Sequence, residues 1–254
     1  MISILDNKDI KKFYAHKFDF GNQTKTTYDD WLKAFEMAIQ KRAVNRCFVG
    51  LSSGYDSGAL TKELSKQKIR FKTFSMFHNE DKRVITQRLE YIPESQVCHM
   101  DEDLWQGYYD FLKGKINDKA MKDPASMGVA YMFETARDEK RRVCISGQGG
   151  DEIISDYALY PKQSTFKGKF PDKLTEWPNF RGNMQMEYLM ELEEIADLYG
   201  IEVRYPFLDI DLVQEFLWLT PELKNKHYKA PLREYLVKNE VPFNEGIKKG
   251  FNPI

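Results

Sequence analysis

Short apolar runs in the first part of the chain have the length of strands. Residues 47–51 are rich in β-forming apolar side chains and flanked by polar ones, which is typical of a strand buried on both faces. Residues 71–76 and 143–145 are further candidates, and residues 96–100 are a weaker one. The pattern therefore predicts several short, buried strands.

Helical periodicity fills the intervals between these strand candidates. Thr27 followed by Asp30 resembles a capping box, which predicts the start of the first helix. Because strands that alternate with helices indicate right-handed crossovers, we expect an α/β fold with a parallel sheet and flanking helices. Apolar residues recur at helical spacing at Trp31, Ala34, Phe35 and Ala38, and again at Val129, Met132, Phe133 and Ala136.

The pattern changes after residue 160. Prolines and glycines cluster in residues 161–182, which predicts a long loop. A helical stripe over residues 189–199 then ends at Gly200, where a left-handed C-terminal residue is expected. We therefore expect a C-terminal helical region after the sheet. We divide the chain into an N-terminal extension, residues 1–25, and one domain, residues 26–254.

Composition narrows the functional classes. The 254 residues include 38 basic and 39 acidic side chains, so the net charge of −1 provides no long-range attraction to nucleic acid or anionic lipid. Mean hydropathy is −0.60, and no apolar run approaches the ~20 residues of a membrane-spanning helix. The first residues do not resemble a signal peptide, so we expect a cytoplasmic protein without nucleic-acid or membrane partners. Cys47, Cys98 and Cys144 show no CxxC spacing, which favours buried free thiols.

The segment after the first strand candidate is rich in small and hydroxyl side chains. Residues 52–58 read SSGYDSG and precede a helix expected to begin near Ala59. Backbone N–H groups at such a turn can hold a phosphate. Because Asp56 would repel that phosphate, it is compatible with phosphate binding only where a cation, Mg²⁺ above all, bridges the two. The Gly-Lys-Ser/Thr of a Walker A loop is missing, which disfavours kinases and GTPases.

A second glycine-rich turn follows the last strand candidate. Residues 146–152 read SGQGGDE. Because neighbouring parallel strands direct their carboxyl ends to one crevice, Asp56 and Asp151 are expected to ligate the same metal. For either loop alone, an ordinary tight turn with an N-capping aspartate is the alternative.

Five segments together resemble one known family. Residues 52–57 resemble the SGGxDS pyrophosphate loop of the N-type ATP pyrophosphatases, the PP-loop enzymes. The other four resemble the synthetase domain of asparagine synthetases and their relatives, the β-lactam synthetases and lasso-peptide cyclases. These segments are the SGxGxDE turn at 146–152, ExRxPFLD at 202–209, KxxLR at 229–233 and a terminal lysine stretch, here KKGFNP, at 248–253.

The resemblance implies an amide ligase that uses ATP and Mg²⁺. A small or peptide carboxylate would attack the α-phosphorus, pyrophosphate would leave, and an amine would then displace AMP. The resemblance assigns pyrophosphate to Ser52, Ser53, Gly54, Asp56 and Ser57, adenine and ribose to Leu51, Met76, Ser146 and Gly147, and the metal to Asp56 and Asp151. Lys229 and Arg233 are assigned near the phosphates, and Lys248, Gln148 and Glu202 are the candidate catalytic residues.

Two loop positions depart from the family pattern. Ser53 replaces a glycine, which adds a side chain close to the phosphates. Gln148 stands where asparagine synthetases carry glutamate and β-lactam synthetases carry tyrosine. Because a glutamine amide can orient a substrate but cannot act as a general base, we expect the substrate or the mechanism to differ.

Other candidate residues keep a structural alternative. Glu202 and Arg204 either contact the substrate or form an ion pair that anchors the following turn. Glu193 and Glu194 replace the Asp-Arg or Asp-Asn pair of asparagine synthetases, which suits an amine-bearing substrate unless they form a solvated helix face. Asp209 is expected to be a helix N-cap.

The nitrogen source is also expected to differ. Glutamine-dependent family members begin with a catalytic cysteine, whereas here Ile2 follows Met1 and the first cysteine is Cys47. We expect nitrogen from ammonia, from a substrate amine, or from a separate glutaminase or partner protein. A catalytically degraded nucleotide-binding partner subunit and a tRNA-modifying PP-loop enzyme are the alternatives. No pattern sets the oligomeric state.

Overall fold

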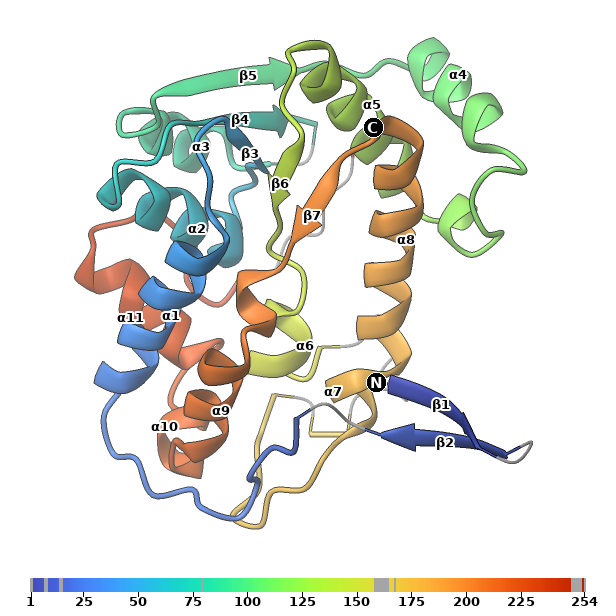
Figure 1. Ribbon diagram of the computed structural model, residues 1–254. Coiled ribbons are helices and arrows are strands. Elements are labelled where there is room, and N and C mark those ends of the chain that lie inside the picture. The colour runs from blue at the N-terminus through green and yellow to red at the C-terminus, as the bar shows by residue number, and fades with distance from the viewer. Residues whose placement is uncertain are drawn as a thin grey trace.

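A five-stranded parallel sheet forms the centre of the computed structural model (Figure 1). The structure describes residues 16–78, 80–157, 165–166, 168–247 and 253, and the backbone of residues 2–6 and 9–13. The strands, in the order β5-β4-β3-β6-β7, are β3 (Cys47–Gly50), β4 (Phe71–Met76), β5 (Glu94–Cys98), β6 (Val143–Ile145) and β7 (Glu202–Arg204). The predicted α/β fold with a parallel sheet is confirmed. The short strand β7 was not predicted.

The strand order places a switch point between β3 and β6. From β3 the chain moves outward through β4 to β5, and it later returns to the other side of β3 as β6 and then β7. The connections that leave β3 and β6 therefore diverge from adjacent strand ends. In open α/β folds, ligands bind at the carboxyl edge of the sheet beside such a switch point.

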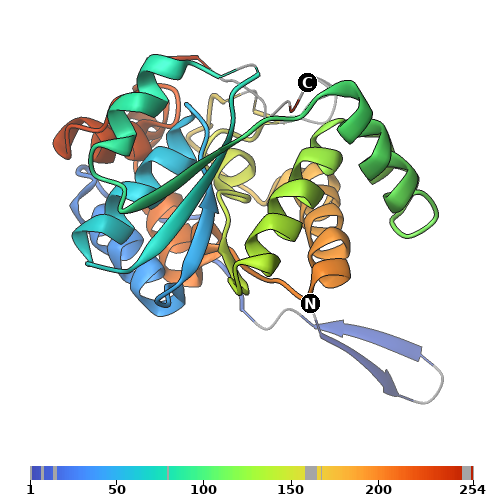
Figure 2. The same ribbon diagram turned by 90° about the horizontal axis from the view of Figure 1, so that it is seen from above.

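Helices cover both faces of the sheet (Figures 1 and 2). One face carries α1 (Asp29–Arg42), α2 (Tyr55–Lys66), α3 (Lys82–Leu89), α9 (Ile210–Trp218) and α11 (Ala230–Lys238). The other face carries α4 (Glu102–Leu112), α5 (Ala125–Asp138) and α8 (Asn183–Tyr199). The shorter helices are α6 (Gly150–Ile154), α7 (Pro178–Arg181), α10 (Pro221–Asn225) and the 3₁₀ turns Ala120–Lys122 and Pro206–Leu208.

Alternating side chains of β3 supply both cores. Cys47 and Val49 pack with the α1 side, whereas Phe48 packs with the α5 side, as the two-residue period of a strand requires. All three residues are almost fully buried. The three cysteines are free and buried, as predicted.

Helix ends differ from the prediction at two places and agree at two others. The N-cap of α1 is Tyr28, without a side-chain cap, so the predicted capping box is wrong. Helix α2 begins at Tyr55 rather than near Ala59. Gly200 adopts the predicted left-handed conformation (φ 62°) after α8, and Asp209 caps α9 by accepting a hydrogen bond from the Asp211 N–H. The predicted loop at 161–182 contains α7, and its residues 161–164 and 167 lie outside the described residues.

The N-terminal residues form two parts. The hairpin of β1 (Ile2–Asp6) and β2 (Asp9–Phe13) projects away from the sheet in Figure 2. Lys25 pairs with the end of α9, where its N–H donates to the Trp218 carbonyl (2.8 Å). The division between residues 25 and 26 stays a prediction. Within the described part of the chain, no helix combines the length and apolar character that crossing a bilayer requires.

Replacing Gly149 by alanine should destabilise the fold more than the same change at Gly114. Both glycines have positive φ, 91° and 75°, so each alanine incurs about 1–2 kcal/mol of backbone strain. A Cβ at Gly149 would also overlap the Leu208 side chain, whereas a Cβ at Gly114 meets nothing within 4 Å. We expect an extra cost of about 1–3 kcal/mol for Gly149→Ala, measured by urea unfolding. Equal costs would show that Leu208 moves freely.

Candidate active site

The loop after β3 folds around two serine hydroxyls. Ser57 Oγ accepts a hydrogen bond from the Ser52 N–H (3.1 Å) and lies 2.9 Å from Ser52 Oγ. Ser52 Oγ also accepts from the Gly54 N–H (3.2 Å). The loop continues directly into α2, so Asp56 and Ser57 lie in the first turn of that helix. The N-terminus of a helix carries partial positive charge and favours an anion.

Ser53 uses both of its donors on one carboxylate. Its N–H donates to Glu80 Oε2 (2.6 Å), and its hydroxyl donates to the same oxygen. The hydroxyl oxygen accepts from the Asp81 N–H (3.2 Å), and Ser53 is almost fully buried. One N–H group of this loop therefore already donates to an anionic oxygen, as the N–H groups of an anion-binding turn do.

A buried ammonium group joins the two acidic residues of the glycine-rich loops. Lys229 Nζ lies 2.6 Å from Asp56 Oδ2 and 2.8 Å from Asp151 Oδ1. The Lys229 side chain is 2% exposed, so this contact is shielded from water. Burial alone would lower the pKa of Lys229, but the carboxylates of Asp151 and Asp56 outweigh it, and the pKa is raised. The ammonium therefore stays protonated between the carboxylates.

Missing side chains let the two loops approach each other. A Cβ at Gly150 would lie 2.6 Å from Asp56 Oδ1, and one at Gly147 would lie 3.0 Å from the Asp56 Cβ. Real Cβ atoms do not approach an oxygen at 2.6 Å, so Asp56 fits against the second turn only because Gly150 is a glycine. The sequence therefore places glycine where the close contact between the loops requires it.

Tyr228 belongs to the same cluster. Its hydroxyl donates to Asp151 Oδ1 (3.1 Å), and its ring contacts that of Tyr55 with centroids 5.5 Å apart. Burial raises the pKa of Tyr228, and the neighbouring carboxylates add to that effect. The phenol therefore remains a neutral hydrogen-bond donor to Asp151.

The residues assigned to nucleotide binding lie at the same edge of the sheet. Leu51 and Met76, at the carboxyl ends of β3 and β4, are 2% and 3% exposed. Ser146 follows β6, and its hydroxyl accepts from the Gln148 N–H (3.2 Å). Arg233, on α11, donates to Glu245 Oε1 (2.6 Å). This placement is compatible with the assignment, which stays a prediction.

One candidate catalytic residue, Glu202, lies away from this edge. Glu202 begins β7 and pairs in register with Val143, the first residue of β6, so it lies at the opposite end of the sheet. Its exposed carboxylate accepts from Arg204 Nε (2.8 Å), which agrees with the ion-pair alternative. The position of Glu202 supports no catalytic role. Lys248 lies outside the described residues.

The acidic pair on α8 divides between two environments. Glu193 accepts from the Tyr205 hydroxyl (2.6 Å), whereas Glu194 accepts from the N–H and amide of Asn117 (2.9 and 2.8 Å). Both carboxylates therefore already hold neighbouring segments in place.

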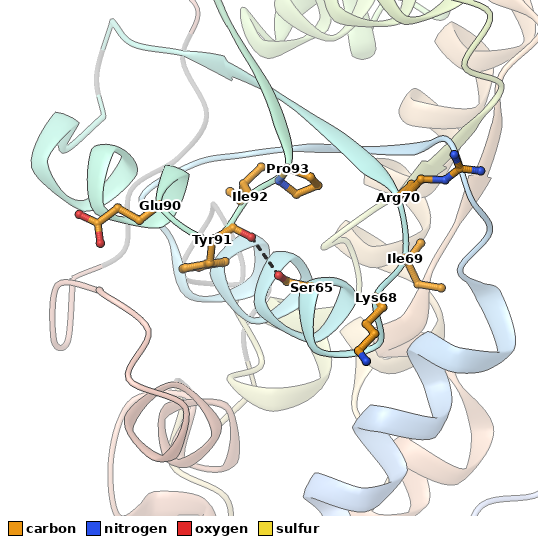
Figure 3. A pocket seen from close by; sticks show the side chains of 8 residues that line it. All are labelled: Ser65, Lys68, Ile69, Arg70, Glu90, Tyr91, Ile92 and Pro93. Atoms are coloured by element: carbon orange, nitrogen blue, oxygen red, sulfur yellow. Dashed lines mark hydrogen bonds between the residues drawn. The ribbon is translucent and has the colours of Figure 1, made fainter.

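A cavity of about 350 Å³ lies away from the motif loops. Figure 3 shows its lining, which comes from the segments that precede β4 and β5, including Lys68, Arg70 and Tyr91. These segments lie at the amino ends of the strands, opposite the edge that carries the motif loops. The cavity is therefore separate from the candidate site.

Three contributors were not predicted from the sequence: Tyr228, Glu80 and Arg88. Tyr228 is adjacent to the motif lysine, and Glu80 follows the carboxyl end of β4, so a search of motif neighbours would have found the first and a search of strand ends the second. Arg88 gave no signal, because an arginine in a polar helix is usually exposed. Its guanidinium donates to the carbonyl oxygens of Ser52 (2.6 Å) and Gly54 (2.9 Å) behind the loop.

The cluster has the chemistry of a cation site beside an anion site. Two carboxylates converge on one cation, the Lys229 ammonium, next to a turn whose N–H already holds an anionic oxygen. Carboxylate oxygens are also the donors that Mg²⁺ uses when phosphate oxygens and water complete its coordination. Asp56 and Asp151 therefore fit a magnesium ion bound together with a phosphate.

Residues 30–190 match the family model of asparagine synthase. Over 231 residues the chain is 24% identical to an asparagine synthetase (glutamine-hydrolyzing) of Cricetulus griseus, an alignment that covers 84% of this chain. The chain spans about 40% of the length of that relative. In structure it is similar to an NMN synthetase from Francisella tularensis, with a TM-score of 0.38 and 13% identity, over 89% of this chain and 100% of the other.

Replacing Lys229 by methionine should make stability depend on Mg²⁺. Removing one partner of a buried ion pair leaves two carboxylates facing each other, which should lower the free energy of unfolding by about 3 kcal/mol. A divalent cation can take the place of the ammonium and restore part of that loss through binding to the folded state. We expect Mg²⁺ to raise the melting temperature of Lys229→Met more than that of the unchanged chain.

Lys224→Met is the matched control for this experiment. Lys224 is equally buried, but its ammonium donates to neutral oxygens, including Gln23 Oε1 (2.6 Å) and the Leu217 carbonyl (2.9 Å). The variant should be destabilised without a gain from Mg²⁺. An equal response of both variants would contradict a cation site at Asp56 and Asp151.

Proposed function

This chain belongs to the asparagine synthase family, and we propose that it is an ATP-dependent ligase that activates a substrate carboxylate as its adenylate and transfers the acyl group to ammonia or an amine. One observation carries the proposal. Asp56 and Asp151 converge on a single buried cation beside residues 52–57, which we call the phosphate-type loop, at the switch point of the sheet. A kinase-type reaction lacks support because the loop has no Walker A lysine.

The proposed chemistry has two steps. A carboxylate oxygen of the substrate attacks the α-phosphorus of ATP, the bond to the bridging β-phosphate oxygen breaks, and pyrophosphate leaves. The amine nitrogen then attacks the acyl carbon, AMP leaves with the bonding electron pair, and the amine loses a proton to solvent. Fixed positive groups and N–H donors near the phosphates stabilise the charge that develops in the first step.

Specific residues of the chain take roles in this proposal. The turn Ser52–Ser57 binds the pyrophosphate part of ATP, and Ser146 and Gly147 border the nucleotide. Asp56 and Asp151 hold Mg²⁺, which when bound neutralises phosphate charge. Lys229, already protonated at this point, contacts either the carboxylates or the phosphates. Lys248 is proposed as the catalytic lysine on the family resemblance.

The acceptor part of the reaction is less constrained. Gln148 follows the same strand as Ser146 and offers an amide that can orient a substrate by hydrogen bonds. We propose that residues 26–254 form the ligase domain. The relative from Cricetulus griseus hydrolyses glutamine, but this chain matches only 40% of it, so we propose ammonia, an amine or a separate glutaminase as the donor.

ATP–pyrophosphate exchange tests the first step directly. With Mg²⁺ and pools of amino acids and other small carboxylates, we expect exchange of labelled pyrophosphate into ATP that depends on one acid. Asp151→Asn should reduce the rate by at least about 100-fold, because it removes a carboxylate from the proposed Mg²⁺ site. Asp138→Asn, at an exposed residue at the end of α5, is the matched control and should keep the rate.

The outcomes separate the alternatives. Exchange that survives in Asp151→Asn would contradict the assigned metal site. Nucleotide binding without exchange in any pool, peptides included, would contradict adenylation and favour a degraded partner subunit. A salt-sensitive gel shift with bulk tRNA would instead favour an RNA substrate.

A further inference from the structure

Arg88 is buried behind the phosphate-type loop. Arg88 is 0% exposed, although the other basic residues of α3, Lys82 and Arg83, are both exposed. The guanidinium donates to the carbonyl oxygens of Ser52 (2.6 Å), Gly54 (2.9 Å) and Ser53 (3.4 Å). Three consecutive carbonyl groups of the loop therefore point toward one cation.

The same guanidinium holds a second segment. Nε and Nη2 of Arg88 both donate to the carbonyl oxygen of Pro242, at 3.0 and 2.7 Å. Pro242 belongs to residues 241–247, which follow α11 and are separated from Arg88 by more than 150 positions in sequence. One side chain thus joins the loop after β3 to a distant part of the chain.

Further contacts of α3 and the loop hold the same two segments. Asn244 Nδ2 donates to Asp81 Oδ2 (3.1 Å), a hydrogen bond that lowers the pKa of Asp81 to about 2. The Gly246 N–H donates to the Tyr55 hydroxyl (2.8 Å). The loop, the start of α3 and residues 241–247 therefore form one bonded unit with Arg88 inside it.

Burying this charge is costly. Among the described residues, the hydrogen-bond partners of Arg88 are all carbonyl oxygens, and burial lowers its pKa to about 10, so it remains protonated at neutral pH. Gly58 makes the space for it, because a Cβ there would lie 2.5 Å from Nη2. A hydrophobic side chain would fill this position at lower cost, so the hydrogen bonds are what the arginine contributes.

Those hydrogen bonds orient the N–H groups of the loop. In a planar trans peptide the carbonyl of one residue and the N–H of the next point in opposite directions. Because the carbonyls of Ser52, Ser53 and Gly54 face Arg88, the N–H groups of the three following residues face away from it. The Ser53 N–H indeed meets the Glu80 carboxylate on the other side.

We propose that Arg88 is a positioning residue that holds the phosphate-type loop and residues 241–247 in a single arrangement, so that the loop presents its N–H groups to the triphosphate. This inference rests on the proposed ATP-dependent function. Arg88 contacts no reacting atom in this arrangement and acts through the peptide groups that it orients. Losing it should weaken triphosphate binding more than it weakens binding of AMP, which has no β- or γ-phosphate.

Hydrogen exchange measured by mass spectrometry tests the coupling without any ligand. In Arg88→Met, peptides that cover residues 51–58 and 241–247 should both exchange about tenfold faster than in the unchanged chain. Arg141→Met is the matched control, because Arg141 is also buried but pairs with Glu94 and Glu139 at the other end of the sheet. It should leave both peptides unchanged. Unchanged exchange in Arg88→Met, or faster exchange in only one peptide, would overturn the proposal.

Nucleotide binding by calorimetry completes the test. A non-hydrolysable ATP analogue with Mg²⁺ should bind Arg88→Met about tenfold more weakly, with a smaller change for AMP. Equal losses for both nucleotides would overturn the role in presenting the loop to the triphosphate. If the unchanged chain binds no nucleotide, the proposed function fails, while the exchange result still decides whether Arg88 couples the two segments.

Two further variants keep the test informative if Arg88→Met does not fold. Arg88→Lys keeps the charge but offers one nitrogen in place of the three that Arg88 uses, so we expect faster exchange in both peptides. Arg88→Ala leaves space in which a free guanidinium ion can bind. Added guanidinium, at concentrations that do not unfold the chain, should therefore slow exchange in both peptides again. Absence of rescue, together with unchanged exchange in Arg88→Lys, would assign Arg88 a packing role only.

Discussion

The ammonium of Lys229 holds together three parts of the chain that are distant in sequence. Asp56 opens α2, Asp151 opens α6, and Lys229 precedes α11, yet the lysine nitrogen lies within 3 Å of both carboxylates. Two carboxylates that contact the same nitrogen lie close together, and they repel each other because water does not screen them. The loops can therefore approach only with a cation between the carboxylates. The arrangement of the candidate site follows from that requirement.

The sheet brings these parts within reach of the cation. Strands β3 and β6 are neighbours, and the connections after them diverge at the switch point, so both turns lie side by side at the carboxyl edge of the sheet. Gly147 and Gly150 remove the side chains that would separate the turns, and Asp56 fills the space. Both carboxylates therefore already face one cation position, and the proposed magnesium ion would bind at that position.

The sequence predicted the features that depend on residues close together in the chain, such as short buried strands and the polar turns after them. Short apolar runs located β3, β4 and β6, and the weaker candidate at 96–100 overlaps β5. The positions of Asp56 and Asp151 after their strands predicted that the two residues meet. The sequence pattern could not locate β7, because its three residues, Glu202 to Arg204, form no apolar run and are too few to show the alternation of a strand. Nor could it locate Arg88, whose partners lie about 35 and 154 positions away and are carbonyl oxygens, which every residue type carries.

The contacts of Ser53 show how the fold accommodates a serine where the family pattern has glycine. A side chain in place of glycine would be expected to crowd the phosphates, but the hydroxyl of Ser53 turns to Glu80 and accepts from the Asp81 N–H. These two residues lead into α3, which also carries Arg88. The serine therefore fastens the loop to the same helix whose arginine orients its carbonyls from behind. Serine is less flexible than glycine, and here its hydrogen bonds hold the loop in one conformation. A phosphate that binds to the Ser53 N–H would have to displace the Glu80 carboxylate or bind next to it.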